Sequence, residues 1–365
     1  MHRSLTLGPL LGVLAACDGG GDGRPLDLPR LEWTWVEVPG AVCGDGSPTG
    51  LAVNPGPEGS TDVLVFLDGG GACWDELTCN GTGFTNPTAS NGPYGAAEFE
   101  ADQASRLEGS ILDRYSVDRS PFGAATLVFI PYCTGDVHWG DAGAAYGWQH
   151  RGAKNLEADA AWLAAHLPAP EKLIVSGSSA GGFGSLLAHD RLRTLWPDAR
   201  GYLIDDSGPP FVGSDITYAL RSAWTASWRL DRTLAPFCPG CFDTQVPLVP
   251  QDLSQVLPAL AQKYPDDRIA LLSTRDDPVI AAFFGLLPAD EFEEGLLELV
   301  DTRIAPLENA RAFLVPETGH VLLEDFGRWE ADGVTLPAWI GHMLHEDNWA
   351  TLGRGEQEPP PAPLR

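Results

Sequence analysis

Short runs of mostly apolar residues, four or five residues long, recur along the chain and are rich in valine, leucine and isoleucine. Continuous apolar runs of this length are typical of strands in a parallel sheet, which are buried on both faces. Each run stops at a proline or a polar residue, where a strand is expected to end. The predicted strands are residues 63–67, 126–130, 172–175, 201–204, 269–272 and 312–315.

Two segments between these runs carry apolar residues at helical spacing, residues 155–167 and 183–195. Strands that alternate with helices predict an α/β fold, with a mostly parallel sheet flanked by helices. In such sheets the chemistry lies at the carboxyl ends of the strands. The residues at or just beyond these ends are Gly70, Cys133, Ser179, Asp206, Asp277 and His320.

The other segments complete the predicted organisation around one α/β domain that covers residues 31–352. An insertion at about residues 209–261 is rich in tryptophan and proline, and we expect it to form part of a pocket wall rather than sheet. Residues 353–365 contain three consecutive prolines and are predicted to be a disordered tail.

The N-terminus reads as a targeting signal. Residues 1–16 contain an apolar run of about twelve residues, too short to span a bilayer, which ends in Leu-Ala-Ala before Cys17. This ending resembles the lipobox of bacterial lipoproteins and implies that Cys17 is lipidated; the alternative is an ordinary signal peptide with an incidental cysteine. Residues 17–30 would then be a glycine-rich tether. We expect an exported protein, anchored by lipid to the bacterial membrane, in the periplasm or at the cell surface.

The net charge of the chain limits the classes of partner that we expect. The chain has 23 Lys and Arg against 50 Asp and Glu, a net charge of −27 at pH 7. Such a surface repels phosphate backbones, so we expect no nucleic-acid partner, and polyanionic substrates are disfavoured. The sequence contains no cofactor motif and no dedicated metal site. The expected partner is a small-molecule or carbohydrate ester, and the expected membrane contact is the N-terminal anchor alone.

Six cysteines remain after Cys17, and an even number in an exported chain predicts disulfides. A four-cysteine zinc site is the alternative, but the two close pairs, C-x₅-C and C-x₂-C, lie far apart in the sequence. Spacing favours one pair that closes a loop and one that closes a tight turn, and elimination gives the third. The expected pairs are Cys73–Cys79, Cys238–Cys241 and Cys43–Cys133.

A candidate nucleophile follows the third predicted strand. Residues 177–181 read GSSAG, which fits the pattern G-x-S-x-G, with a strand before it and a helix after it. A sharp strand-to-helix turn forces its central residue into strained φ/ψ and needs small neighbours, which the glycines supply. The alternative is a glycine-rich turn that cradles phosphate, but the lysine of a P-loop is missing. We therefore predict Ser179 as the nucleophile.

A serine nucleophile needs a histidine base and a carboxylate to orient it, and in this fold the chain order is serine, acid, histidine. Of the eight histidines, His320 lies in a loop after a late predicted strand; the alternative is a solvated loop histidine. The acid should follow the strand at 269–272, where Asp277 is preferred and Asp276 is the reserve. Either carboxylate could instead cap a helix, because Pro278 suits a first helical turn.

The anionic intermediate of such a reaction needs hydrogen-bond donors, each worth roughly 10²–10³ in rate. The Ala180 N–H, at the start of a helix, is one candidate. The others are expected from residues 68–73, where three consecutive glycines follow the first predicted strand and allow close backbone approach. The alternative for these glycines is a simple tight turn.

Four motifs together resemble, in order, those of the pectin acetylesterase/Notum family. They read CGDGSP at 43–48, GGGAC at 69–73, IPYCTGD at 130–136 and GSSAGG at 177–182. With the acid and histidine loops, the resemblance spans roughly residues 43–320. It implies an α/β-hydrolase fold that acts on carboxylic esters, with Ser179 as nucleophile and His320 as base. It also implies an oxyanion hole formed by the backbone amides of Gly70, Gly71 and Ala180.

The resemblance bears on the remaining positions too. The family's acid precedes a glutamine by three residues and an aromatic by six or seven; Ile280 and Phe283 occupy these offsets from Asp277, which favours Asp277 although the glutamine is missing. The resemblance also implies the pairs Cys43–Cys133 and Cys73–Cys79. Ala72 stands where relatives carry a bulky aromatic, a departure that would reshape the acyl pocket.

We therefore predict a serine carboxylesterase that removes acyl groups, with acetyl the first choice, from a carbohydrate or another alcohol through an acyl-enzyme. One alternative is a long-chain acyl or lipid esterase, in which Trp224, Trp228 and Phe237 would line an acyl tunnel rather than pack in the core. The other is a non-catalytic surface-binding lipoprotein. It is disfavoured because such a protein has no physical need to keep Ser179, His320 and a carboxylate.

Overall fold

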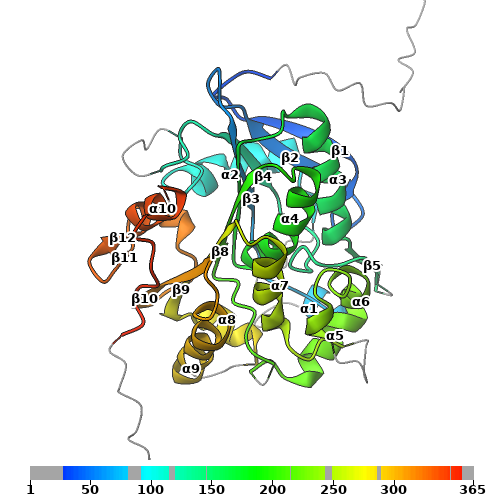
Figure 1. The fold of residues 1–365 in the computed structure, drawn as a ribbon. Coiled ribbons are helices and arrows are strands. Elements are labelled where there is room, and N and C mark those ends of the chain that lie inside the picture. Colours follow the sequence, from blue (N-terminus) through cyan, green and yellow to red (C-terminus); the bar gives the residue numbers. More distant parts are fainter. Residues whose placement is uncertain are drawn as a thin grey trace, which may run out of the picture.

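An eight-stranded sheet runs through the centre of the protein in the computed structural model (Figure 1). The structure describes residues 28–80, 92–114, 120–144, 146–213, 215–242, 249–285, 289–345 and 347–355. The predicted signal peptide, Cys17 and most of the predicted tether lie outside the described residues.

The order of the strands places six parallel strands side by side. β1 and β2 pair antiparallel, and so do β2 and β4, whereas every later pair in the sheet is parallel. The six predicted strands are all present in this parallel part. In sheet order the strands are β1 (Thr34–Val42), β2 (Pro48–Asn54), β4 (Thr126–Ile130), β3 (Asp62–Leu67), β7 (Lys172–Ser178), β8 (Arg200–Asp206), β9 (Arg268–Asp276) and β10 (Ala310–Thr318).

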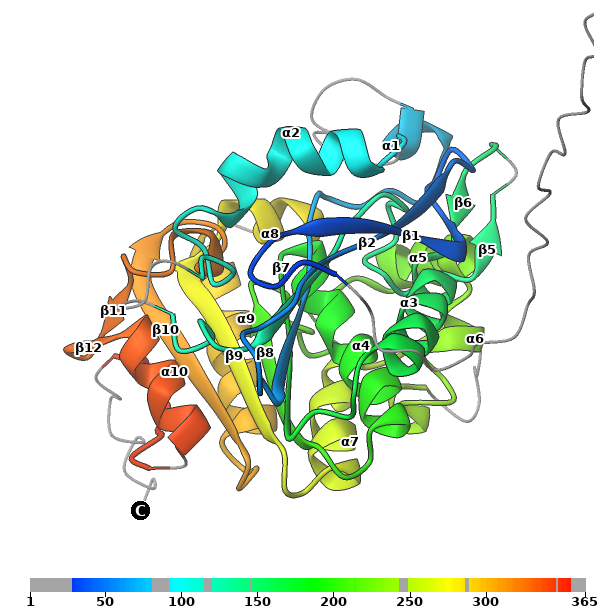
Figure 2. The same ribbon diagram turned by 90° about the horizontal axis from the view of Figure 1, so that it is seen from above.

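Side chains alternate between two hydrophobic cores, one on each face of the sheet. Val63 and Val65 of β3 point into one core, and Leu64 and Phe66 point into the other. This double burial explains why the strands read as continuous apolar runs. Figures 1 and 2 show helices on both faces. The first core contains residues of α3 (Gly152–His166), α4 (Ala180–Leu195), α7 (Val256–Lys263) and α9 (Ala289–Leu299), and the second contains residues of α2 (Ala96–Leu107) and α10 (Leu336–His345).

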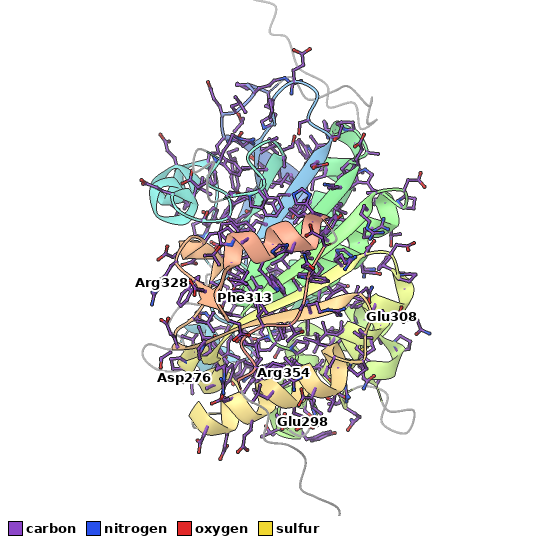
Figure 3. The ribbon with its side chains drawn as sticks, turned by 60° about the vertical axis from the view of Figure 1, so that its left-hand side comes forward. Asp276, Glu298, Glu308, Phe313, Arg328 and Arg354 are labelled. Carbon is purple, nitrogen blue, oxygen red and sulfur yellow. A yellow bond between two sulfur atoms is a disulfide. The ribbon has the colours of Figure 1, made fainter. Side chains whose placement is uncertain are left out.

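The second core is closed by aromatic packing between β10 and the last helix. The ring of Phe313 lies 5.4 Å from that of Trp339 in α10, centroid to centroid (Figure 3). Trp339 in turn packs against Trp349, at 5.5 Å. These contacts hold α10 on the face opposite α4, so the molecule is a mostly parallel sheet between two helical layers, an α/β-hydrolase-like fold.

The described residues of the insertion between β8 and β9 contain helices and 3₁₀ turns and no strand of the main sheet. The insertion consists of α5 (Tyr218–Trp228), α6 (Leu230–Thr233), two 3₁₀ turns (Pro239–Cys241 and Leu253–Gln255) and α7. The remaining elements are the short helices α1 (Glu76–Asn80) and α8 (Pro278–Phe283), a π-helical turn (Val300–Ile304), a 3₁₀ turn (Leu323–Asp325), and two ribbons, β5 (Ala142–Gly143) with β6 (Gln149–His150) and β11 (Glu330–Ala331) with β12 (Val334–Thr335).

Both ends of the folded body extend slightly beyond the predicted limits. Arg30, at the end of the predicted tether, donates a hydrogen bond of 2.9 Å to the Gly56 carbonyl oxygen. Gly353, at the start of the predicted tail, donates from its backbone to Asp332, and Arg354 pairs with Asp301. Residues 356–365 lie outside the described residues. In the described part of the chain, none of the helices has both the length and the apolar character needed to cross a bilayer.

Candidate active site

The predicted site residues gather at one edge of the sheet because their strands are parallel neighbours. β3, β7, β8, β9 and β10 follow one another in the sheet, so their carboxyl ends meet at the same edge. Directly beyond these ends lie the glycine loop (residues 68–73), Ser179, Asp206, Asp277 and, in the histidine loop (residues 319–323), His320.

Ser179 occupies a strained turn between β7 and α4. Its backbone has φ +58° and ψ −120°, a conformation that costs free energy in any residue except glycine. Only glycine fits two residues before and two residues after Ser179. A Cβ on Gly177 would lie 2.2 Å from the Gly181 oxygen, and one on Gly181 would lie 2.0 Å from the Leu67 oxygen. The turn therefore presents the Ser179 side chain at the N-terminus of α4, where the helix dipole favours negative charge.

His320 contacts Asp277 and not Asp276. The His320 Nδ1 atom lies 2.8 Å from Asp277 Oδ2 and 3.1 Å from Oδ1. Because a carboxylate only accepts, Nδ1 carries the proton and Nε2 is left as the acceptor, which is the state that a general base needs. Asp276 instead accepts a hydrogen bond from Thr318 near the surface (Figure 3).

Asp277 also caps helix α8, so the two roles considered for it coexist. Its Oδ1 atom accepts from the backbone N–H groups of Val279 and Ile280, both at 3.0 Å. The side chain is fully buried. Two backbone donors and one imidazole donor fix this carboxylate, and it in turn fixes the His320 ring.

Asp206 joins the serine turn (residues 178–180) to the histidine loop. Its Oδ2 atom accepts from Ser178 Oγ at 2.7 Å and from the Leu323 N–H at 3.0 Å, and both oxygens accept from the Leu322 N–H at 2.9 Å. Burial raises the pKa of Asp206 to about 6, while these hydrogen bonds and the His320 charge oppose the rise. The sequence places Asp206 at a strand end, but that position alone gives it no role.

The main chain of Asp206 supports the serine turn as well, since its carbonyl oxygen accepts from the Ser179 N–H at 2.8 Å. Within the described residues, Ser179 Oγ and the His320 imidazole are not hydrogen-bonded to each other. They lie on two adjoining turns that Asp206 connects. Hydrogen bonds between a catalytic nucleophile and its base are often long in the absence of substrate and shorten when substrate is bound.

The glycine loop lies against the serine turn. Gly70 and Gly71 have φ values of +151° and +75°, which side chains rarely tolerate. A Cβ on Gly69 would stand 3.0 Å from the Ser179 Cβ, so the two backbones are in contact. Gly71 and Ala180 line the cavity beside Ser179, whereas Gly70 does not belong to its described lining.

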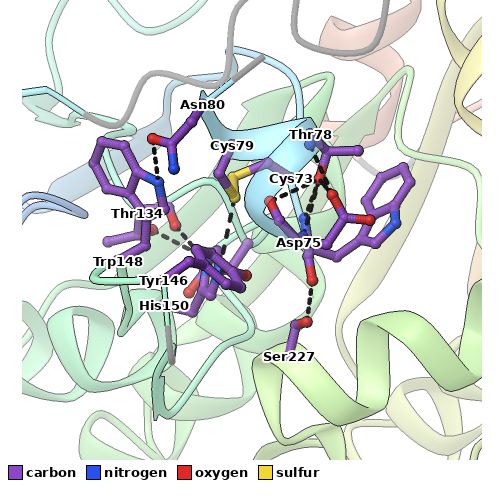
Figure 4. The surroundings of a disulfide bond; sticks show 12 residues. Cys73, Asp75, Thr78, Cys79, Asn80, Thr134, Tyr146, Trp148, His150 and Ser227 are labelled. Carbon is purple, nitrogen blue, oxygen red and sulfur yellow. Dashed lines mark hydrogen bonds between the residues drawn. A yellow bond between two sulfur atoms is a disulfide. The ribbon is translucent and has the colours of Figure 1, made fainter.

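Cys73 ties the end of the glycine loop to its surroundings (Figure 4). Its backbone N–H donates to the Gly135 oxygen at 2.8 Å, and its oxygen accepts from the Trp228 indole N–H at 2.8 Å. Its side chain forms a disulfide with Cys79. The backbone oxygen of the next residue, Trp74, accepts a hydrogen bond from Ser227 Oγ. The loop is thus bound to the insertion helix α5.

All three predicted disulfides are present, Cys43–Cys133, Cys73–Cys79 and Cys238–Cys241. His150 lies beside the second of them, with Nε2 4.0 Å from Cys79 Sγ. Cys73, Cys79 and His150 are close enough to share a metal ion. Zinc binds cysteine as the thiolate, and both sulfur atoms are bonded to each other here, so this group does not fit a zinc site.

An apolar pocket opens beside Ser179. Trp224 and Trp228 of the insertion form one wall, with their rings stacked 5.5 Å apart. Phe237, the third aromatic of the insertion considered above, is buried in the core instead. The described lining consists of Gly71, Ala72, Val137, Trp139, Ser179, Ala180, Phe183, Trp224, Trp228, Leu253, Ile280, Phe283 and Phe284.

Comparison with known proteins agrees with this geometry. A family model described as pectinacetylesterase matches residues 31–235, which include the glycine loop and Ser179. Palmitoleoyl-protein carboxylesterase notum1' of Xenopus laevis is 29% identical over 199 residues, 53% of this chain and 37% of that protein. Palmitoleoyl-protein carboxylesterase NOTUM of Mus musculus is 30% identical over 196 residues (52% and 34%), and that of Drosophila melanogaster is 27% identical over 242 residues (62% and 31%). The match spans about a third of the length of these relatives. Because the family model covers more than half of the chain, the protein belongs to the pectinacetylesterase family.

Proposed function

We propose that the protein is a serine carboxylesterase, in which Ser179 is the nucleophile, His320 the general base and Asp277 the carboxylate that orients it. The observation that carries the proposal is the contact of His320 Nδ1 with the buried Asp277, beside a serine in a strained strand-to-helix turn. Family membership and the carboxylesterase relatives support the same reaction. The presence of Ser179, His320 and Asp277 together also disfavours a non-catalytic binding role.

The proposed reaction runs through an acyl-enzyme. His320 Nε2 takes the Ser179 proton as Oγ attacks the ester carbonyl carbon, and the tetrahedral oxyanion accepts hydrogen bonds from the Gly71 and Ala180 amides, with Gly70 as a further donor. The carbon–oxygen bond to the alcohol breaks, and His320 gives its proton to the leaving alkoxide. Water, deprotonated by His320, then attacks the acyl carbon, and the carboxylic acid leaves as Oγ recovers a proton.

The cavity favours an acyl group with a hydrocarbon chain. Its walls are side chains of tryptophan, phenylalanine, isoleucine, leucine and valine, which offer a carbonyl or hydroxyl group few partners but bury apolar surface well. The relatives that match are named for removing palmitoleoyl groups from proteins. We therefore place the acyl chain in this cavity and the alcohol at its mouth.

Acetyl esters of a carbohydrate are the second candidate, which the family's name supports. For this candidate a neutral sugar suits the chain better than a polyuronate, because a protein of net charge −27 repels a polyanion.

The three disulfides are consistent with a protein that is exported from the cytoplasm. We propose that it is lipid-anchored through Cys17.

A series of p-nitrophenyl esters tests the acyl group. We expect kcat/KM to rise from acetate to hexanoate, by up to about fourfold per methylene, because each buried CH₂ contributes about 0.8 kcal/mol. Ile280→Phe, which narrows the cavity, should cancel this rise, whereas Val279→Phe at the exposed neighbouring position should keep it. Activity that falls beyond about four carbons would instead favour the acetyl candidate.

Gly69→Ala tests the glycine loop. The new Cβ would stand 2.5 Å from the Ser178 oxygen and 3.0 Å from the Ser179 Cβ, so the loop must move away from the serine turn. We expect kcat to fall about ten- to a hundredfold, because small displacements of catalytic donors have effects of this size. Gly341→Ala in α10, where the Cβ meets no atom within 4 Å, is the matched control and should keep full activity. Equal rates for both variants would contradict a role for the glycine loop.

A further inference from the structure

Two backbone segments that meet at the end of β8 are strained. Ser207 and Val321 have φ values of +56° and +58°, and a β-branched residue such as valine rarely adopts this conformation. The Val321 N–H donates to Ser207 Oγ at 3.2 Å, and the next two N–H groups of the histidine loop donate to Asp206. Strain of this kind persists only where neighbouring contacts impose it. The end of β8 therefore imposes the path of the chain directly after His320.

The side chain of Asp206 also reaches the serine turn, through Ser178 Oγ. One fully buried carboxylate thus accepts hydrogen bonds from both segments that carry the proposed nucleophile and base, although these segments are more than 140 residues apart in the sequence. A carboxylate suits this position because it accepts several hydrogen bonds at once and donates none.

The adjacent residue Asp205 shows what a buried aspartate without this role looks like. It is also fully buried, but within the described residues one side-chain oxygen accepts only from the Gly208 N–H at 3.0 Å and the other has no hydrogen-bond partner. Burial, with the charge of Asp206 as a smaller cause, raises the pKa of Asp205 well above its usual value.

Asp206, in contrast, interacts with His320. Its pKa is raised to about 6, by burial above all, and the His320 charge is among the causes that oppose this rise. His320 also contacts Asp277.

We propose that Asp206 is a positioning residue, which holds the histidine loop against the serine turn. This role rests on the proposed esterase function. It gives the site two carboxylates with separate tasks, since Asp277 orients the imidazole ring and Asp206 sets the distance between base and nucleophile.

The test compares Asp206→Asn with the matched control Asp205→Asn in the full-length protein, with p-nitrophenyl acetate as the substrate. For Asp206→Asn we expect kcat to fall about ten- to a hundredfold with KM within about twofold, because the loss is one of geometry at the reacting atoms. Asp205→Asn should keep kcat within about threefold, because within the described residues the Asp205 side chain accepts a hydrogen bond only from the Gly208 N–H and none from the serine turn or the histidine loop.

Ser178→Ala serves as the second variant, in case Asp206→Asn does not fold, which thermal melting will show. It removes one hydrogen bond to Asp206 but keeps the Asp206 side chain. We expect kcat to fall about threefold or more with KM within about twofold, because the serine turn loses one of its contacts with Asp206. A fall in kcat at an unchanged melting temperature would not arise from a merely structural role.

Two outcomes overturn the proposal alone. One is that Asp206→Asn and Asp205→Asn lose activity equally, and the other is that Ser178→Ala leaves kcat unchanged, while the wild-type protein hydrolyses the ester and Ser179 reacts with a fluorophosphonate. If the wild-type protein hydrolyses none of the esters and Ser179 takes no fluorophosphonate, the proposed function fails together with the role of Asp206.

Discussion

Ser179→Ala is expected to lower kcat/KM for p-nitrophenyl acetate by about 10⁴-fold or more, since loss of a serine nucleophile removes the acyl-enzyme route. Labelling by a fluorophosphonate should disappear with it. The melting temperature should stay close to that of the wild-type protein, because alanine fits wherever serine fits and the glycines around the turn are unchanged.

Ser176→Ala on β7, the strand that precedes Ser179, is the matched control. The Ser176 hydroxyl is fully buried and has no hydrogen-bond partner in the described part of the chain, so its removal costs no contact. This variant should keep full activity and fluorophosphonate labelling. Residual turnover of Ser179→Ala near the wild-type rate would refute the assignment of the nucleophile.

Asp277→Asn is expected to lower kcat by about 10³- to 10⁴-fold, because an amide at this position no longer fixes the imidazole tautomer or stabilises the imidazolium. Asparagine caps helices about as well as aspartate, so the start of α8 should survive and the melting temperature should change little. The loss would therefore report on His320 rather than on folding.

Asp276→Asn is the matched control for this variant. Asp276 precedes Asp277 directly, but its side chain accepts from Thr318 and not from His320. We expect kcat within about threefold of the wild-type value, since surface substitutions of this kind have small effects. A larger loss in Asp276→Asn than in Asp277→Asn would exchange the roles of the two residues.

The parallel part of the fold could be predicted from the sequence because both of its faces are buried. β3, β4, β7, β8, β9 and β10 each contain an uninterrupted apolar run, and such runs stand out in any sequence. β1 and β2 escaped prediction for the opposite reason. Much of β1 is exposed, and both strands contain proline and glycine, so neither forms a continuous apolar run.

The candidate site could be predicted as far as local chain geometry dictates it. The turn at Ser179 requires glycines on both sides, and this requirement is visible in the sequence. Local chain geometry could not decide between Asp276 and Asp277 as the acid. Neighbouring residues at a strand end point to opposite sides, and which side faces His320 depends on how β9 and β10 pack. The family spacing favoured Asp277, and the structure places Asp277 against His320.

Asp206 illustrates what could not be predicted at all. Its partners come from residues 178, 322 and 323, and no local pattern in the sequence indicates contacts between segments so far apart. Its position at a strand end was visible, but Asp205 beside it is just as buried. Only the three-dimensional arrangement separates Asp206, which both segments share, from Asp205.

Trp228 belongs to two parts of the site at once, because its ring lines the cavity while its indole N–H binds the Cys73 oxygen at the end of the glycine loop. In the proposed esterase, a substitution at Trp228 would therefore change both the acyl-binding cavity and the glycine loop. Variants intended to alter the substrate range should begin at Ile280 and Phe283 of α8, which line the cavity.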